Sequence, residues 1–276
     1  MSETKIIKIH DLINEIDHCI KHKKPFSYIR WGDGGIKMIH AIMTNDKSQI
    51  KEIAHKEGIP ENKFMDVMKA WAFFSRKANY IDSPQVYYDG FFWERCRKKF
   101  KPMSKKTDKR LRMWRELYNY AEFDNENYCN PEVNFLLCLR LGNKRNILNI
   151  MKDRKIAFIT ACKDIPNKLS KYDVTLIPIV SQYENHYEAC YKNTIKIIER
   201  DVKKYDLFFV SAGELGRIYT GLIKHYGGIA LDMGFIAEYW SKGDLPDRLL
   251  MFMKKNPNNE LEFKLTDEGN KYKDFI

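Results

Sequence analysis

Three short segments combine glycines with charged side chains in a pattern that suits a phosphate-bearing ligand. The first is Arg30-Trp-Gly-Asp-Gly-Gly35, the second is Ser211-Ala-Gly-Glu-Leu-Gly-Arg217, and the third runs from Gly227 to Trp240. A guanidinium binds phosphate oxygens as a two-pronged donor, and glycine lets the backbone approach a ligand closely. The N-terminus of a helix presents unpaired N–H groups to anions. Neither glycine loop completes the dinucleotide-binding or P-loop fingerprint, so each alone is also explained by an ordinary turn.

The third segment adds carboxylates. Asp232 ends an apolar stretch and is followed by Gly234 and Glu238, which predicts two carboxylates close together beside the glycine loops. Paired carboxylates can bind Mg²⁺ or Mn²⁺ together with a diphosphate, or one of them can act as a general base. Asp33 in the first loop could hold a ribose hydroxyl, a metal or the loop itself. The structural alternative for Asp232 is that it only caps the turn after it.

The elements around these segments indicate a parallel sheet. Strands are predicted over 26–30, 155–160, 174–180, 205–211 and 229–232, and helices over 6–20, 36–43, 54–75, 187–203 and 215–225. Within 54–75 the helix start is expected around Pro60 and Glu61. This alternation favours a Rossmann-like, mostly parallel α/β sheet with flanking helices. We expect one domain over 1–276, with a helical, basic insert over 60–150. In such sheets ligands bind at the carboxyl ends of the strands, where both glycine loops are expected.

The charge of the chain is concentrated in one place. The 276 residues contain 48 Lys and Arg against 37 Asp and Glu, a formal net charge of +11. Residues 95–115, the basic segment, hold eleven cations and one acid, which leaves the rest nearly neutral. This segment is either a solvated face or a surface for an anionic acceptor, a nucleic acid or a membrane. No apolar run is long enough to span a bilayer and no secretory signal is evident, so we expect a cytoplasmic protein, with peripheral membrane contact left open.

Taken together, the three segments resemble the GT-D type glycosyltransferases. Their N-terminal R-x-G-D-G-E motif is matched by Arg30, Gly32, Asp33 and Gly34, with Gly35 in place of the acidic residue. Their C-terminal stretch, a glycine loop, a helix and G-G-x-A-x-D-x-G, is similar to residues 211–240. The resemblance implies transfer of a sugar from a nucleotide-diphosphate donor, commonly a UDP-sugar, to a glycan or related acceptor. Some members use a D-x-E metal motif, of which only the glutamate, Glu238, is present here.

These observations predict a nucleotide-sugar-dependent glycosyltransferase. His186 follows the strand expected over 174–180 and either reaches the same crevice or is a structural histidine. Asp232, Glu238 and Asp33 are the catalytic candidates, and the first two are also the metal candidates. The alternative is a nucleic-acid-binding protein, or a glycosyltransferase that acts on nucleic acid, through the basic segment. The residues expected to bind the donor are Arg30, Gly32, Asp33, Gly34, His186, Ser211, Gly213, Glu214 and Arg217.

Overall fold

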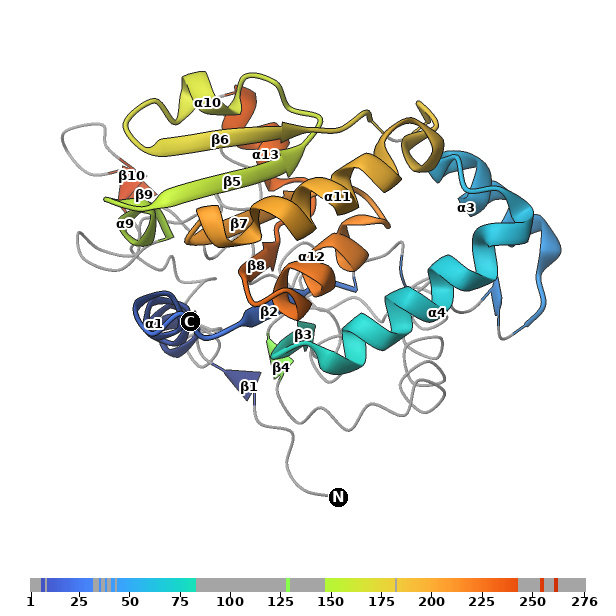
Figure 1. Cartoon of the computed structure of the whole chain (residues 1–276), viewed down its shortest axis with the longest axis horizontal. Helices are drawn as coiled ribbons and strands as arrows, with labels where there is room; N and C mark the ends of the chain where they lie inside the picture. The colour runs from blue at the N-terminus through green and yellow to red at the C-terminus, as the bar shows by residue number, and fades with distance from the viewer. Residues whose placement is uncertain are drawn as a thin grey trace.

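The protein is an α/β sandwich around one parallel sheet (Figure 1). The computed structural model describes residues 6–7, 9–31, 35, 38, 41–42, 44–82, 128–129, 147–181, 183–242, 254–255 and 261–262. In this part of the chain the sheet has eight strands, in the order β1-β4-β3-β2-β8-β7-β5-β6, and every neighbouring pair is parallel. The strands are β1 (Ile6–Ile7), β2 (Phe26–Ile29), β3 (Tyr80–Asp82), β4 (Tyr128–Cys129), β5 (Lys155–Thr160), β6 (Asp173–Pro178), β7 (Leu207–Ser211) and β8 (Ile229–Asp232).

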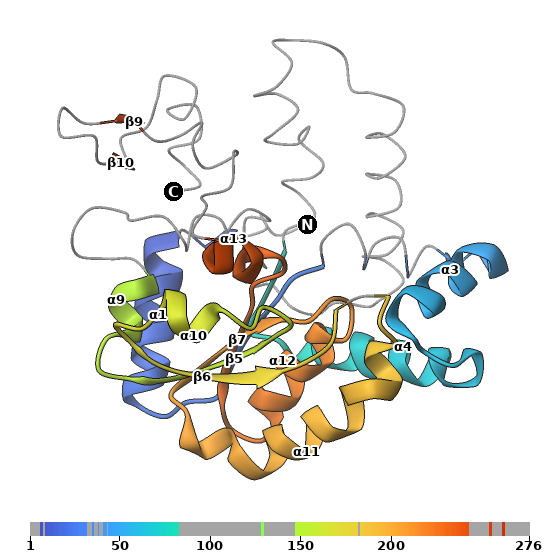
Figure 2. The ribbon, with the colours of Figure 1, turned by 90° about the horizontal axis from the view of Figure 1, so that it is seen from above.

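Helices cover both faces of the sheet (Figure 2). On one face α4, α11 and α12 pack around a core that includes Trp71 and Tyr219, and α3 joins this core at the end of α4. On the other face α1, α9, α10 and α13 enclose a second core that includes Phe158 and Phe209. The helices are α1 (Ile9–Lys21), α3 (Lys47–Glu57), α4 (Glu61–Lys77), α9 (Ile147–Met151), α10 (Ile165–Lys168), α11 (Lys192–Asp201), α12 (Gly216–His225) and α13 (Ile236–Lys242).

Shorter elements complete the described part. A π-helical turn, Tyr187–Tyr191, precedes α11, and a 3-10 turn, Val202–Lys204, follows it. Two further strands, β9 (Lys254–Lys255) and β10 (Leu261–Glu262), pair with each other in an antiparallel arrangement outside the main sheet. The Rossmann-like, mostly parallel α/β sheet that the sequence predicts is therefore confirmed. Residues 83–127 and 130–146, which hold the basic segment, lie outside the described residues, and the predicted insert and domain limits stay predictions.

The helix that carries the second glycine loop, α12, is buried on nearly every side. It packs against β2 and β8 on one side and against α4 and α11 on the other. Gly221 makes this possible, because a Cβ at that position would overlap the side chain of Phe74 in α4. α4 in turn buries Phe64, Val67, Met68 and Trp71, an i, i+3, i+4, i+7 spacing that marks one face of a helix. The start of α12 is thereby fixed against the middle of the sheet.

The N-terminal and C-terminal halves of the sheet meet at one pair of strands. β2 lies beside β8, with Phe26 opposite Ile229 and Tyr28 opposite Leu231. All four residues of each strand are buried, as expected for a parallel sheet with both faces covered. No helix within the described ranges is both long and apolar enough to cross a bilayer.

Candidate active site

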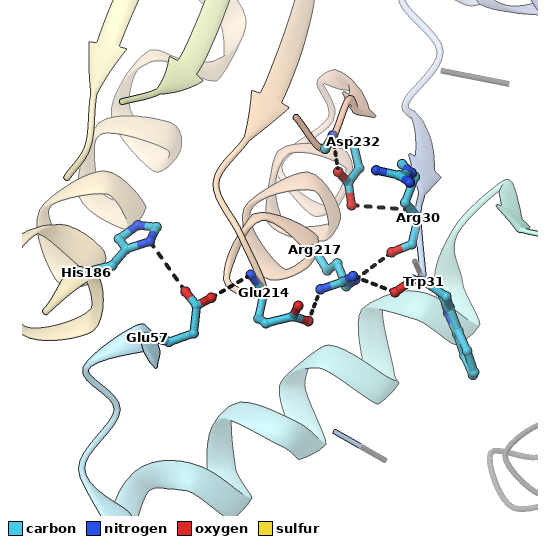
Figure 3. Close-up of polar contacts among 8 residues, drawn as sticks. Arg30, Trp31, Glu57, His186, Glu214, Arg217 and Asp232 are labelled. Carbon is cyan, nitrogen blue, oxygen red and sulfur yellow. Dashed lines mark hydrogen bonds and ion pairs between the residues drawn. The ribbon is translucent and has the colours of Figure 1, made fainter. Parts of the chain in front are cut away.

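The carboxyl ends of β2 and β8 are joined by the side chain of Asp232 (Figure 3). One carboxylate oxygen, Oδ2, accepts a hydrogen bond from the backbone N–H of Arg30 at 3.3 Å. The other, Oδ1, accepts from the backbone N–H of Gly234 at 3.0 Å. Asp232 is 4% exposed, so these bonds compensate the burial of its charge. The sequence expectation of a turn cap at Asp232 is met, and the cap also fixes the neighbouring strand.

The Arg30 side chain lies over the turn that follows Asp232. Its guanidinium carbon is 5.9 Å from the centroid of the Phe235 ring, within range of a cation–π contact. Gly234 has a φ of +56°, and a Cβ at this position would overlap Nη1 of Arg30. The left-handed backbone favours glycine here, and any other residue would also displace the end of the Arg30 side chain. Arg30, Asp232 and Phe235 together form a partly exposed cluster with both signs of charge.

Arg217, expected at the donor phosphates, turns its guanidinium to the main chain at the end of β2 (Figure 3). Nε donates to the carbonyl of Arg30 at 2.5 Å, and Nη2 donates to the carbonyl of Trp31 at 2.5 Å. Nη1 donates to the carboxylate of Glu214, also in a buried position. Arg217 is 5% exposed, and its hydrogen bonds fix Arg30 and Trp31, the first two residues of the first glycine loop. Its contact with a diphosphate stays a prediction.

The second glycine loop begins where β7 ends. Gly213 has a φ of +56°, which a glycine adopts without strain, and Glu214 follows it into the interior. The connection after β5 leads to β6 on one side, whereas the connection after β7 leads to β8 on the other. Ligands bind at such a switch point in open parallel sheets. Ser211 ends β7 there, and its buried Oγ has no hydrogen-bond partner within the described part of the chain.

A buried carboxyl group that the sequence analysis missed lies behind this loop. Glu57, at the end of α3, is fully buried, and its Oε1 accepts from the backbone N–H of Glu214 at 3.3 Å. Burial, reinforced by the neighbouring Glu214 carboxylate, raises the pKa of Glu57 to about 7. A signal was present: Glu57 is an acid in the last turn of a helix, where the helix dipole disfavours it, and Gly58 ends the helix there.

His186 is brought to this carboxyl group and lies apart from the cluster around Arg30. Its Nδ1 is 3.8 Å from Oε2 of Glu57, and its Nε2 is 3.1 Å from the hydroxyl of Tyr219. His186 is 1% exposed, and burial lowers its pKa to about 4, so the imidazole is neutral at physiological pH. Of the two readings given by the sequence, this placement favours a structural histidine.

Three of the predicted residues, Gly32, Asp33 and Gly34, lie outside the described part of the chain. Glu238 is exposed in the first turn of α13, and its backbone N–H donates to the carbonyl of Phe235 at 3.1 Å. Gly35, which replaces the acid of the motif, is buried: a Cβ there would be 3.0 Å from the Trp71 ring and 3.5 Å from the Arg217 guanidinium. Among the described residues, no group of three or more His, Cys, Asp or Glu side chains could hold a metal ion.

The opposite edge of the sheet carries a cavity of about 610 Å³ at the amino ends of β5 and β6. Ligands of open parallel sheets bind at the carboxyl ends of the strands, so this cavity is not the expected site. Its lining mixes both signs of charge, and one of its acids, Asp206, accepts the Lys155 N–H at 2.9 Å. The lining residues are Lys152, Asp153, Arg154, Lys155, Lys171, Tyr172, Asp173, Lys204 and Asp206.

The chain matches the model of the GT-D fold-like domain over residues 7–240. Its structure is similar to that of the domain of unknown function 1792, described as having a distinct glycosyltransferase fold, with a TM-score of 0.50 and 17% identity. A selenomethionine structure of that domain gives a TM-score of 0.51 and 16% identity. Each similarity covers 100% of this chain and 95% of the other. No curated protein matches the sequence significantly. The chain belongs to the GT-D family and has a glycosyltransferase fold.

Proposed function

We propose that this protein transfers a sugar from a nucleotide-diphosphate donor, with UDP-sugars as the first candidates, to a glycan or related acceptor. The family and the fold support a glycosyltransferase. The observation that carries the proposal is the junction of Arg30 and Asp232 at the carboxyl ends of two adjacent parallel strands, with a 3.3 Å hydrogen bond between them. This junction brings a cation and a carboxylate to the edge where such sheets bind ligands.

The reaction explains why both charges are needed. The acceptor hydroxyl oxygen forms a bond to the anomeric carbon, the bond from that carbon to the diphosphate oxygen breaks, and a base takes the hydroxyl proton. Negative charge grows on the departing diphosphate, where a guanidinium or backbone N–H groups lower the barrier. Arg30 is the proposed cation, with the Gly213 loop beside it. The proposed base is Asp232, with Glu238 as the alternative.

The other donor contacts that the sequence predicts remain part of the proposal. Gly32, Asp33 and Gly34 continue the chain from Arg30, and Ser211 lies at the switch point. Glu214 and Arg217 act through the main chain at the base of the two loops. A contact of His186 with the donor is the least supported, because the residue is buried beside Glu57.

A divalent cation has no step in this proposal. Within the described residues no group of three or more His, Cys, Asp or Glu side chains is placed to hold a cation. Binding of nucleic acid or of a membrane through the basic segment has no support from the family or the fold, and is not proposed. Assays with and without Mn²⁺ test the metal directly.

Calorimetry and donor hydrolysis test the function. The wild-type protein is titrated with UDP, GDP and TDP and with their sugars, with and without Mn²⁺, and sugar release is followed in parallel. Arg30→Ala should weaken binding of the preferred nucleotide about 10-fold to 100-fold, the effect of losing a charged hydrogen bond. The matched control is Arg76→Ala, in the exposed last turn of α4. Absence of binding and hydrolysis for every donor would overturn the proposal.

A further inference from the structure

A continuous row of polar contacts runs behind the candidate active site, from the end of β6 to the end of β8 (Figure 3). Neighbouring members lie within 3.8 Å of each other. The row passes from the C-terminal half of the sheet to β2 and returns to β8. Glu57 is its only member from α3. The members, in order, are His186, Glu57, Glu214, Arg217, Arg30 and Asp232.

Glu57 is held in the row from one side only. Its Oε1 accepts the Glu214 N–H, whereas its buried Oε2 has no hydrogen-bond partner among the described residues. Oε2 faces Nδ1 of His186 at 3.8 Å, longer than a hydrogen bond. A buried oxygen without a partner costs about 1–3 kcal/mol, so stability alone gives no reason for a carboxyl group here.

The carboxyl group is placed there by a specific contact of α3. Gly58 ends α3 with a φ of +64°, and a Cβ there would overlap the backbone of Asn185. The backbone N–H of Tyr183 donates to the carbonyl of Lys56 at 2.7 Å. The last turn of α3 is thereby fixed against the segment that leads to His186, and Glu57 is directed into the row.

We propose that Glu57 is a positioning residue for the donor site, which holds the β7–α12 loop so that Arg217 keeps the end of β2, and with it Arg30, in place. This inference rests on the proposed function. Glu57 binds the main chain of Glu214, Glu214 binds the Arg217 guanidinium, and Arg217 binds the carbonyls of Arg30 and Trp31. Glu57 acts through the loop, because its hydrogen bond is to the main chain of Glu214 and the contact with Arg30 is made by Arg217.

The protonation of Glu57 gives this role a measurable signature. The groups that face it are Lys56 from α3, Glu214 from the β7–α12 loop, Arg217 and Tyr219 from α12, and His186. Burial and Glu214 raise the pKa of Glu57 to about 7, whereas burial keeps His186 neutral. A protonated Glu57 can point its proton toward an unprotonated Nδ1 of His186, 3.8 Å away, while Nε2–H donates to Tyr219. An ionised Glu57 favours the opposite tautomer, with a proton on Nδ1.

Three variants separate these states. Glu57→Gln retains an acceptor for the Glu214 N–H and an N–H donor toward His186, so it mimics the protonated acid at every pH. Glu57→Ala removes both. Glu52→Gln, on the exposed side of the same helix, is the matched control. Calorimetric titration with UDP and the near-UV circular dichroism of the buried Trp31–Trp71 pair, whose rings are 5.0 Å apart beside Arg217, are measured from pH 6 to pH 8.5.

The ratio of the Kd of Glu57→Gln to that of wild type should change several-fold across pH 7, and this ratio cancels the titration of UDP itself. Glu57→Ala should weaken UDP binding at least 10-fold and change the tryptophan signal. At pH 6, Glu57→Gln should show the wild-type UDP affinity and the wild-type tryptophan signal. A pH-independent ratio, or an alanine variant with wild-type affinity and spectrum, overturns the inference. If Glu57→Ala does not fold, the ratio decides alone.

Failure of the proposed function gives a different result. If wild type binds no nucleotide, the tryptophan signal still tests the link from Glu57 to Arg217. The signal should then titrate near pH 7 in wild type and in Glu52→Gln, and not in Glu57→Gln. A wild-type signal that does not titrate near pH 7 would overturn the role of Glu57 by itself.

Discussion

The side chain of Arg217 binds the main chain of Arg30, 187 residues earlier in the sequence. The contact joins the start of α12 to the carboxyl end of β2, and the adjacent carbonyl of Trp31 accepts from the same guanidinium. A planar fork with several fixed N–H donors suits this arrangement, whereas a lysine ammonium cannot reach two carbonyls and a carboxylate in the same geometry.

Arg217→Lys is therefore expected to be destabilising despite the conserved charge. Loss of buried hydrogen bonds to the Trp31 carbonyl and the Glu214 carboxylate should lower the free energy of unfolding by about 1–3 kcal/mol. Denaturant unfolding monitored by tryptophan fluorescence measures this. Arg200→Lys, whose guanidinium is exposed beside Asp201, is the control and should leave the unfolding midpoint unchanged. Equal midpoints for the two variants would contradict the structural role of Arg217.

Gly234→Ala should affect ligand binding through Arg30. The added Cβ overlaps Nη1 of Arg30, so the guanidinium must shift from its present position over Phe235, and the φ of +56° adds about 1–2 kcal/mol of backbone strain. We expect UDP affinity to fall by about 10-fold, the effect of losing one charged hydrogen bond. A double-mutant cycle isolates the cause: in an Arg30→Ala background, Gly234→Ala should have little further effect on affinity. An undiminished effect there would exclude Arg30 as the intermediary.

Glu57→Gln should change the pH dependence of stability in a defined direction. The pKa of Glu57 rises from 4.5 in the unfolded chain to about 7 in the folded protein. Between these values the folded state holds a proton that the unfolded state releases, so wild-type stability falls as pH rises. Relative to wild type, Glu57→Gln should gain up to about 3 kcal/mol between pH 4.5 and pH 7.5. Unfolding free energies at both pH values, with Glu52→Gln as reference, test the sign.

His186→Gln should show the opposite slope. Burial lowers the pKa of His186 from 6.5 to about 4, so in this interval the unfolded chain holds a proton that the folded protein lacks. Wild-type stability contributed by this group therefore falls as pH decreases from 6.5 to 4. Relative to wild type, the variant should gain stability on going from pH 7.5 to pH 5. His22→Gln, at an exposed histidine, is measured alongside as the reference. The same slope in both variants would refute the burial effect.

The sequence was sufficient for strands that are buried on both faces. The predicted strands 155–160 and 229–232 coincide with β5 and β8, because a continuous apolar run between polar residues leaves little choice of register. The segment 54–75, predicted as helical with a start around Pro60, holds the end of α3 and most of α4, which are separate helices. The break lies at Gly58, whose left-handed backbone ends α3 and leaves no room for a Cβ against Asn185, far away in the sequence. The start predicted near Pro60 is where α4 begins.

Part of the candidate site could be predicted for a topological reason. Arg30, Ser211 and Asp232 all follow or end parallel strands, and the carboxyl ends of such strands share an edge. Glu57 could not be found in this way, because it ends a helix and its bond to the Glu214 N–H spans 157 residues. The direction of the Arg217 guanidinium depends likewise on the backbone of β2, which the local sequence around α12 does not encode.

The pairing of β2 with β8 also determines when the protein can complete its fold during synthesis. β2 is made among the first residues, yet the strand that covers its edge is the last one of the main sheet in the described part of the chain. Until residue 232 has left the ribosome, the backbone N–H and C=O groups along this edge of β2 lack their native partner strand. Such an edge pairs readily with another chain, so the nascent N-terminal half is the stage most exposed to aggregation.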